Sequence, residues 1–499
     1  MPPEPDVPIA PGQLAERAAL VHALALRLGA QVIETHISWI LLTPAFAYKV
    51  KKPVRFAFLD YTTLQRRRHF CHEEVRVNQR MAPSLYLGVA RITGKPPAPE
   101  IDGAGPVLDY AVHMRRFPDG ALFSERLAAG ALALRDVDGF AAVLAAAHAA
   151  APVRRRAPAA QSSKLTRALS ALDGARAVLS TGERDHLCEW LEAGARKLWP
   201  EWIERRRKGR IRECHGDLHL DNIVDLDGQP AAFDAIDFEP ALRWIDIAED
   251  AAFPVMDFAA RGRPDFAWRF LNDWLDAAGE HEAAGVLRYA LVYRALVRAQ
   301  VEHLRAPSGS AAATYARAAL GWSNPALPRL VITHGLPGSG KTFQSQRLLE
   351  RIGAIRVRAD VERKRLFGLG ALESSHARGL DIYTREATTS TYGRLFALAR
   401  IILAAGFSVV LDAAFLKRGE RDAAHELARS CGAGFEILAC EAPDEILQQR
   451  IAARTSDASE ADTAVLRQLR TVVDPLGPDE EVAVKGSPSA RSPARWPAS

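Results

Sequence analysis

A glycine-rich loop at residues 335–342 carries the most specific chemistry in the sequence. It reads GLPGSGKT and fits the pattern G-x-x-x-x-G-K-S/T. Glycines allow successive backbone N–H groups to converge on one anion, and the positive end of a following helix points at the same anion. Lys341 is then expected to reach the β- and γ-phosphates of ATP, and the hydroxyl of Thr342 to hold Mg²⁺. The predicted members of this nucleotide site are Gly335, Gly338, Ser339, Gly340, Lys341 and Thr342.

A second polar cluster lies at residues 214–222, which read CHGDLHLDN. The H-x-D-x-x-x-x-N spacing is that of a kinase catalytic loop. Asp217 is predicted to accept the proton of an acceptor hydroxyl, and Asn222 to hold a metal ion that bridges the ATP phosphates. After a short apolar strand, Asp237 is predicted as a further metal ligand, with Asp234 as a weaker competitor. The alternative is a polar loop in which these residues only cap turns.

A lysine and a glutamate complete the second cluster. The strand expected at residues 46–50 contains the pattern A-x-K, which is typical of the kinase strand whose lysine grips the α- and β-phosphates. Lys49 and Lys51 share one face of this strand, and Lys49 is preferred because it matches the pattern. In kinases a helix glutamate pairs with this lysine, and Glu74 in the helix expected at 64–81 is the candidate. The alternative is that these are ordinary solvated charges.

Charged residues also follow the strands after the glycine-rich loop. Asp412 is predicted to serve Mg²⁺, because it ends an apolar strand as a Walker-B aspartate does. Asp360 begins the sequence D-x-x-R; it is expected to act as the base, while Arg363 orients an anionic group. Arg450 and Arg454 are one helical turn apart and are candidates to close over the phosphates. The alternative for these two arginines is surface solvation.

Two kinds of periodicity indicate how these residues are positioned. In the first half we expect helices at 14–28, 64–81 and 140–151, and strands at 35–42, 46–50, 108–117 and 231–236. From residue 329 onward, strands at 330–332, 354–358, 407–411 and 435–440 alternate with helices at 343–352, 383–405, 420–430 and 444–454. Such alternation indicates a parallel sheet with right-handed crossovers, and ligands bind at the carboxyl ends of its strands.

The first half resembles a known family at its most specific motifs. HGDLHLDN, followed by IDFEP and WIDIAEDAAF, is similar to the aminoglycoside phosphotransferase and choline kinase-like family over about residues 30–305. The resemblance implies a protein-kinase-like bilobal fold, ATP, Mg²⁺ and an alcohol acceptor. It also implies that the residues at the matching positions have the roles described above, and these residues are Asp217, Asn222, Asp237, Lys49 and Glu74.

One departure from that family concerns the loop that covers the phosphates. No glycine occurs between Gly29 and Gly88, so this loop is missing or replaced by residues 42–45. A rival hypothesis follows, in which the first half is a catalytically degenerate, ligand-sensing domain that regulates the second half.

The last third resembles the small P-loop kinases grouped around polynucleotide 5′-hydroxyl kinase, gluconate kinase and zeta toxins, over about residues 329–475. The glycine-rich loop and the D-x-x-R at Asp360 are the specific matches. The whole arrangement is similar to a bacterial two-domain family, in which a phosphotransferase-like domain precedes a kinase of the AAA family ATPase type.

Length and composition set the remaining expectations. With 499 residues, 48% hydrophobic and 25% charged, the chain is expected to be a multidomain α+β and α/β protein. The expected parts are a tail and helix at 1–29, a kinase-like domain at 30–305, a linker at 306–328, a P-loop domain at 329–475 and a disordered tail at 476–499. The sequence starts without a signal-peptide pattern and contains no membrane-length apolar run, which favours a cytoplasmic location.

The motifs together predict an ATP- and Mg²⁺-dependent phosphotransferase with two nucleotide sites and a small-molecule hydroxyl as acceptor. A third hypothesis is a nucleic-acid 5′-hydroxyl kinase, because of the polynucleotide kinase resemblance. The net charge of +5 and the lack of a basic, aromatic-interleaved groove favour it less. No motif specifies the acceptor or the oligomeric state, because specificity lies in variable loops.

Overall fold

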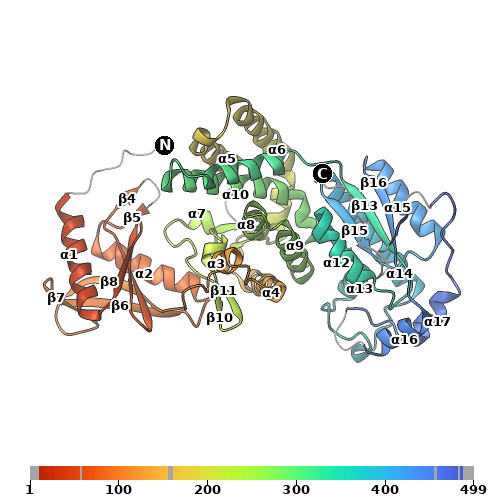
Figure 1. The fold of residues 1–499 in the computed structure, drawn as a ribbon, viewed down its shortest axis with the longest axis horizontal. Coiled ribbons are helices and arrows are strands. Elements are labelled where there is room, and N and C mark those ends of the chain that lie inside the picture. The colour runs from red at the N-terminus through yellow and green to blue at the C-terminus, as the bar shows by residue number, and fades with distance from the viewer. Residues whose placement is uncertain (1–10, 57–58, 156–160, 454–457, 481–483, 487–499) are drawn as a thin grey trace. The chain divides into compact units, whose positions relative to one another are not determined.

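The computed structural model describes residues 11–56, 59–155, 161–453, 458–480 and 484–486. The chain divides into two compact units (Figure 1). The first unit comprises residues 1–158 and 204–254, and the second comprises residues 159–203 and 255–499. Each unit contains one of the two polar clusters that the sequence predicts.

A six-stranded antiparallel sheet forms the amino-terminal part of the first unit, in the order β1-β2-β3-β8-β6-β7. Its strands are β1 (Gln31–Glu34), β2 (Ser38–Leu42), β3 (Phe46–Lys51), β6 (Tyr86–Lys95), β7 (Ala98–Ile101) and β8 (Val107–Arg115). The predicted strands at 46–50 and 108–117 are confirmed. Only residues 38–42 of the strand predicted at 35–42 form a strand, because the hydroxyl of Thr35 accepts a hydrogen bond from the N–H of Ser38 and makes a turn before it.

Two helices cover the faces of this sheet. Leu24 of α1 (Pro11–Leu28) packs with Trp39 and Val50 on one face. Cys71 of α2 (Leu64–Asn78) packs with Ala47 on the other face. Because side chains alternate along a strand, the odd-numbered residues of β3 all face α2. This alternation determines where the two lysines of β3 point.

The rest of the first unit surrounds the second polar cluster. Its elements are β4 (Arg55–Phe56), β5 (Leu59–Asp60), α3 (Phe123–Ala128), α4 (Leu134–Ala150), β9 (Ile211–Glu213), η2 (Leu220–Asn222), β10 (Ile223–Leu226), β11 (Gln229–Ala232), α7 (Pro240–Arg243) and β12 (Trp244–Asp246). Helix α8 (Ile247–Ala260) continues into the second unit. The strand predicted at 231–236 ends at Ala232, because Asp234 has a positive φ of 61° that interrupts the extended backbone.

Helices make up the amino-terminal part of the second unit. They are α5 (Gln161–Gly174), η1 (Arg176–Val178), most of α6 (Thr181–Arg207), α9 (Pro264–Ala278), η3 (His281–Ala283), α10 (Ala284–Arg305) and α11 (Ala311–Ser323). The linker predicted at 306–328 therefore contains a helix, α11, whose Tyr315 is buried and donates a hydrogen bond to Asp257. The domain boundary predicted at residue 305 stays a prediction, while the compact unit that holds the glycine-rich loop starts upstream of it.

A five-stranded parallel sheet completes the second unit, in the order β14-β15-β13-β16-β17. Its strands are β13 (Arg329–His334), β14 (Ala354–Arg358), β15 (Ser408–Asp412), β16 (Gly434–Ala439) and β17 (Val484–Gly486). The helices are α12 (Lys341–Ile352), α13 (Ala359–Leu366), η4 (His376–Arg378), α14 (Arg385–Ala404), α15 (Arg418–Ser430), α16 (Asp444–Ala452) and α17 (Thr463–Arg470). The predicted parallel sheet is confirmed.

The disordered tail predicted at 476–499 is wrong for part of its length. Glu480 is buried and pairs with the buried Arg421 of α15. Residues 484–486 add β17 to the sheet edge beside β16. The other residues of that segment, 481–483 and 487–499, lie outside the described residues.

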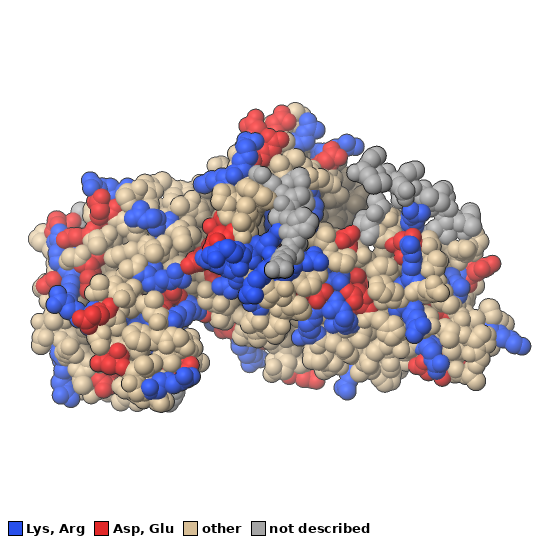
Figure 2. All heavy atoms as spheres, turned by 180° about the vertical axis from the view of Figure 1, so that it is seen from behind, with Lys and Arg blue, Asp and Glu red and all other residues tan. Residues whose placement is uncertain are grey.

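Figure 2 shows acidic and basic side chains interspersed over one face of the molecule. Such mixing agrees with the mild net charge of +5. In the described part of the chain, no helix has both the length and the apolar character that crossing a membrane requires.

Candidate functional site

The loop between β13 and α12 has the shape of a phosphate cradle. Gly335 and Gly338 have positive φ values of 150° and 83°. A Cβ atom at Gly335 would collide with the carbonyl oxygen of Cys440, and one at Gly338 would lie 2.8 Å from the carbonyl oxygen of Leu447. Only glycine fits these two positions, because both the backbone conformation and the space exclude a side chain. Gly340 then caps the amino end of α12.

Lys341 and Asp412 both lie beside the loop and the first turns of α12. The ammonium of Lys341 donates to the carbonyl oxygens of Gly335 and Leu336, both at 2.9 Å. Asp412 is the last residue of β15, and its carboxylate accepts a hydrogen bond of 3.2 Å from Ser345. Ser345 also donates to the carbonyl oxygen of Thr342 at 3.0 Å. The end of β15 is thereby joined to the first turn of α12.

A cavity of about 1030 Å³ opens over this loop. Residues from four predicted groups line it: Gly338, Gly340, Lys341, Thr342, Asp360, Arg363, Asp412 and Arg450. Gly335 and Ser339, also predicted for the nucleotide site, belong to the loop but are not among the residues that line the cavity. Arg454 lies outside the described residues. The structure therefore brings the phosphate loop, the D-x-x-R pair and the Walker-B-type aspartate to one cavity.

Arg363 is a buried cation in the wall of the cavity. Its guanidinium donates to the carbonyl oxygen of Ile382 at 3.0 Å and to the hydroxyl of Thr388 at 3.2 Å, and it lies 5.1 Å from the ring centre of Tyr383. Among the described residues, its Nε has no hydrogen-bond partner and no carboxylate forms an ion pair with it. Burial raises the pKa of Tyr383, and the nearby carboxylate of Asp360 raises it further. A buried guanidinium without a counter-charge favours an anion beside it.

Arg450 projects from α16 to the same loop, where it donates to the carbonyl oxygen of Gly338 at 3.1 Å. The position agrees with a residue that closes over bound phosphates. Arg450 itself is exposed.

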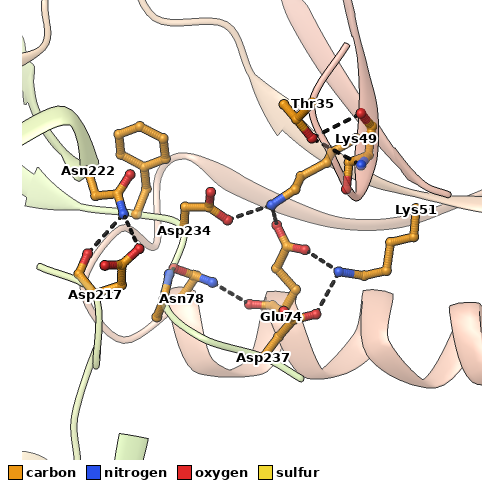
Figure 3. Close-up of polar contacts among 12 residues, drawn as sticks. Thr35, Lys49, Lys51, Glu74, Asn78, Asp217, Asn222, Asp234 and Asp237 are labelled. Atoms are coloured by element: carbon orange, nitrogen blue, oxygen red, sulfur yellow. Dashed lines mark hydrogen bonds and ion pairs between the residues drawn. The ribbon is translucent and has the colours of Figure 1, made fainter. Parts of the chain in front are cut away.

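The first unit contains a buried ion cluster around Glu74 (Figure 3). Lys49 donates to one carboxylate oxygen of Glu74 at 3.0 Å, and Lys51 donates to the other at 2.7 Å. Burial alone would raise the pKa of Glu74, but the two ammonium groups lower it to about 2. The predicted pair of Lys49 and Glu74 is thus in contact, and Lys51 shares the same glutamate.

Asp234 and Asp237 occupy different environments in this cluster. Asp237 is buried and accepts a hydrogen bond of 2.6 Å from Lys51. Asp234 accepts one of 2.5 Å from Lys49, and 46% of its side chain is exposed. Its N–H donates to the hydroxyl of Tyr86 at 3.0 Å, which fixes the unusual backbone. Sequence reasoning preferred Asp237 as the metal ligand, whereas the geometry gives the accessible position to Asp234.

Asp217 and Asn222 lie together at the edge of the cluster. The amide of Asn222 donates to the carbonyl oxygen of Asp217 at 2.9 Å and to its carboxylate at 3.5 Å. Asp250 of α8 accepts hydrogen bonds from the N–H groups of His215 and Gly216, so it holds the loop from behind. Figure 3 shows Asp234 lying between the Asp217 and Asn222 pair and Lys49.

Residues 42–45, which were expected to replace the missing glycine loop, lie at a strand connection in the structure, and this expectation stays a prediction. In the structure the first hairpin, between β1 and β2, turns at residues 35–37. Residues 42–45 instead join β2 to β3, at the far end of the strands from that turn. At residues 35–37 the hydrogen bonds between Thr35 and Ser38 make a compact turn.

Comparison with known proteins reveals relatives of nearly the whole chain. Residues 330–476 match the family described as AAA domain. Over 454 residues the chain is 30% identical to an uncharacterized protein of Mycobacterium tuberculosis and to one of Mycobacterium bovis, and the alignments cover 88% of this chain and 89% of each relative. The chain belongs to the family of these mycobacterial proteins. Because the alignments extend far beyond residues 330–476, this family includes both halves of the chain.

Two solved kinases show weaker similarity to this family member. An ethanolamine kinase of Plasmodium vivax is 14% identical, with a TM-score of 0.35, and the match covers 59% of this chain and 80% of that one. A gluconokinase of Sinorhizobium meliloti 1021 is 19% identical, with a TM-score of 0.25, and the match covers 32% of this chain and 82% of that one. The predicted mixed α+β and α/β class, with a P-loop domain that contains a parallel sheet in the last third of the chain, is confirmed. The kinase-like fold of the first half stays a prediction.

Several residues of the cavity carried no signal in the sequence. Tyr383, Arg385 and Lys417 line it, yet they belong to segments that no motif marks. Their positions follow from where α14 and α15 begin, which only the packed domain determines. In the first unit the sequence indicated Asp234 only as the weaker candidate, since the positive φ that sets its backbone cannot be read from residue type alone.

Proposed function

We propose that this protein is a kinase that uses ATP and Mg²⁺ to phosphorylate a hydroxyl group of a small molecule at the cavity of the second unit. The observation that supports this most is the single cavity of about 1030 Å³ lined by the phosphate loop, Asp360, Arg363 and Asp412. A phosphoryl transfer needs a phosphate cradle, a metal site and a base within reach of one another. All three sets of groups face this space.

The residues of the cavity divide into binding and proton-transfer roles. Backbone N–H groups of the loop and the ammonium of Lys341 bind the β- and γ-phosphates. The hydroxyl of Thr342 and the carboxylate of Asp412 are hard oxygen donors of the kind that Mg²⁺ prefers, and when bound the ion neutralises charge on the phosphates. The acceptor oxygen forms a bond to the γ-phosphorus, the bond to the β,γ-bridging oxygen breaks, ADP leaves, and Asp360 takes the hydroxyl proton.

Arg363 suggests the charge of the acceptor. Its buried guanidinium lies one helical turn from Asp360, and within the described chain it donates hydrogen bonds only to neutral oxygens. An acceptor that carries a phosphate, carboxylate or sulfate group would supply the missing counter-charge. We therefore propose an anionic alcohol as the substrate class.

Replacing Asp360 by asparagine tests the chemical role. The Asp360→Asn variant is expected to bind ATP as wild type does but to transfer label about 10²–10⁴-fold more slowly, because an amide cannot accept the proton. Purified protein is incubated with γ-labelled ATP and fractionated small-molecule extracts, and labelled products are separated. Asp173→Asn is the matched control, since Asp173 is exposed on α5. Equal label transfer by Asp360→Asn and the control would contradict the proposal.

We propose further that the first unit holds a second nucleotide site, with Asp234 and Asn222 as metal ligands and Asp217 as base. The support is the accessible carboxylate of Asp234 between Lys49 and the Asp217 and Asn222 pair. Asp237 then has a structural role, because its carboxylate neutralises the buried Lys51.

Two asparagine substitutions separate these roles. In a Lys341→Ala background, which silences the other site, Asp234→Asn is expected to weaken Mg²⁺-dependent binding of a fluorescent ATP analogue at least tenfold with little loss of stability. Asp237→Asn is expected to lower the melting temperature, because the buried ammonium of Lys51 loses one of its negatively charged partners. The reverse pattern would restore Asp237 as the metal ligand. Binding without any phosphoryl transfer would favour the ligand-sensing hypothesis for this half.

A further inference from the structure

The free edge of the parallel sheet is closed by side chains from outside the P-loop domain. Strand β14 is the edge strand at the end of the sheet opposite β17, and it has β15 on one side only. On its other side Asn272 of α9 donates to the carbonyl oxygen of Ala354 at 2.9 Å and accepts from the N–H of Arg356 at 2.6 Å. His281 of η3 donates through Nε2 to the carbonyl oxygen of Arg356 at 3.0 Å. Both side chains are 1% exposed.

The side chain of Arg356 links β14 to the helix that follows the phosphate loop. Its guanidinium donates to the carbonyl oxygen of Thr342 at 3.3 Å and to the hydroxyl of Ser345 at 3.4 Å. Ser345 in turn donates to Asp412. Burial lowers the pKa of Arg356, and within the described chain no carboxylate forms an ion pair with it. A buried cation is thus held beneath the first turn of α12, next to both proposed Mg²⁺ ligands.

A second connection runs from η3 to the helix that carries the proposed base. Glu282 of η3 accepts from Arg394 at 2.9 Å, and Arg394 donates to Glu362 at 3.2 Å. Glu362 is 2% exposed and lies on α13, between Asp360 and Arg363. Helix α13 follows directly after β14, so η3 is connected to both the strand and the helix.

We propose that α9 and η3 are part of the phosphotransferase site, with Asn272 and His281 as positioning residues that set β14, Arg356 and α13. The inference rests on the proposed function of the second unit. An edge strand with unsatisfied backbone groups is free to shift or exchange with water, and a displacement of about 1 Å at a reacting centre costs roughly 10²-fold in rate. The AAA-domain match begins at residue 330, so the catalytic unit extends upstream of the matched region.

An isosteric substitution tests this inference in the full-length protein. Asn272→Leu keeps the shape of the side chain but removes both hydrogen bonds to β14. The control is Phe270→Leu, a buried change on the same helix at a residue whose ring packs against Phe258 of α8. Steady-state release of inorganic phosphate from MgATP, with water as acceptor, gives kcat and KM below the melting temperature of each variant. Hydrogen–deuterium exchange follows peptides 341–345 and 354–358.

We expect Asn272→Leu to lower kcat at least tenfold, to change KM for ATP less than threefold, and to speed exchange in both peptides. The Asn272→Asp variant keeps the acceptor for the N–H of Arg356. Its kcat and its exchange rates are expected to lie between those of wild type and those of Asn272→Leu. Phe270→Leu should alter stability without these changes. If Asn272→Leu matches Phe270→Leu in kcat and in exchange, the inference is overturned. If wild type and Lys341→Ala release phosphate equally, the proposed function itself fails, whatever Asn272→Leu does to exchange.

Discussion

Substitution of Lys341 by alanine is expected to reduce phosphoryl transfer from ATP by a factor of about 10²–10³, because it removes a preorganised positive charge from the phosphates. The ammonium already lies against the loop, where it donates to the carbonyl oxygens of Gly335 and Leu336. Little rearrangement is therefore needed for it to meet a β- or γ-phosphate. Its loss should act on the transition state more than on the fold.

The effect is measured as initial rates with γ-labelled ATP, together with the melting temperature of each protein. Lys197→Ala, which removes an exposed lysine of α6, is the matched control. A Lys341→Arg variant keeps the charge but not the compact ammonium, and it should recover only part of the rate. An unchanged rate in Lys341→Ala would show that phosphoryl transfer does not take place in the second unit.

Substitution of Glu74 by glutamine is expected to lower the free energy of unfolding by about 3–5 kcal/mol, because two buried ammonium groups would lose the carboxylate that they share. Lys49 and Lys51 contact separate oxygens of Glu74, and its side chain is fully buried. The measurement is urea unfolding at pH 7. The control is Glu100→Gln, since Glu100 pairs with Arg27 at the surface, and we expect a change of no more than about 1 kcal/mol there.

Comparison of wild type with Glu74→Gln also tests how stability depends on pH. The pKa of Glu74 is lowered from 4.5 to about 2 in the folded state. Its ionised form therefore contributes stability above about pH 4.5, and this contribution is lost as the pH falls toward 2. Wild type should lose stability across that window more steeply than Glu74→Gln, which has no such proton to bind. Parallel curves would show that Glu74 is not held as an anion by the two lysines.

Local sequence was sufficient wherever a motif and its supporting elements are contiguous. The loop at 335–342 was recognisable because its glycines, lysine and threonine are close in the chain, and the strand and helix beside it have clear apolar patterns. The same holds for Asp360 and Asp412, because Asp412 ends β15 and Asp360 follows the adjacent parallel strand β14, which places both at the carboxyl edge of the sheet. The parallel sheet itself followed from the alternation of strands and helices.

Tertiary structure decided which distant charges meet. Residue spacing placed Lys49 and Lys51 on one face of a strand, and the motif favoured Lys49. Packing of β3 against α2 places both lysines on Glu74 and separates Asp234 from Asp237. It also brings Asn272 to β14, across 82 residues of chain. Contacts of this kind depend on how elements pack over long range, whereas residue spacing encodes only which side chains share a face of one strand, helix or loop.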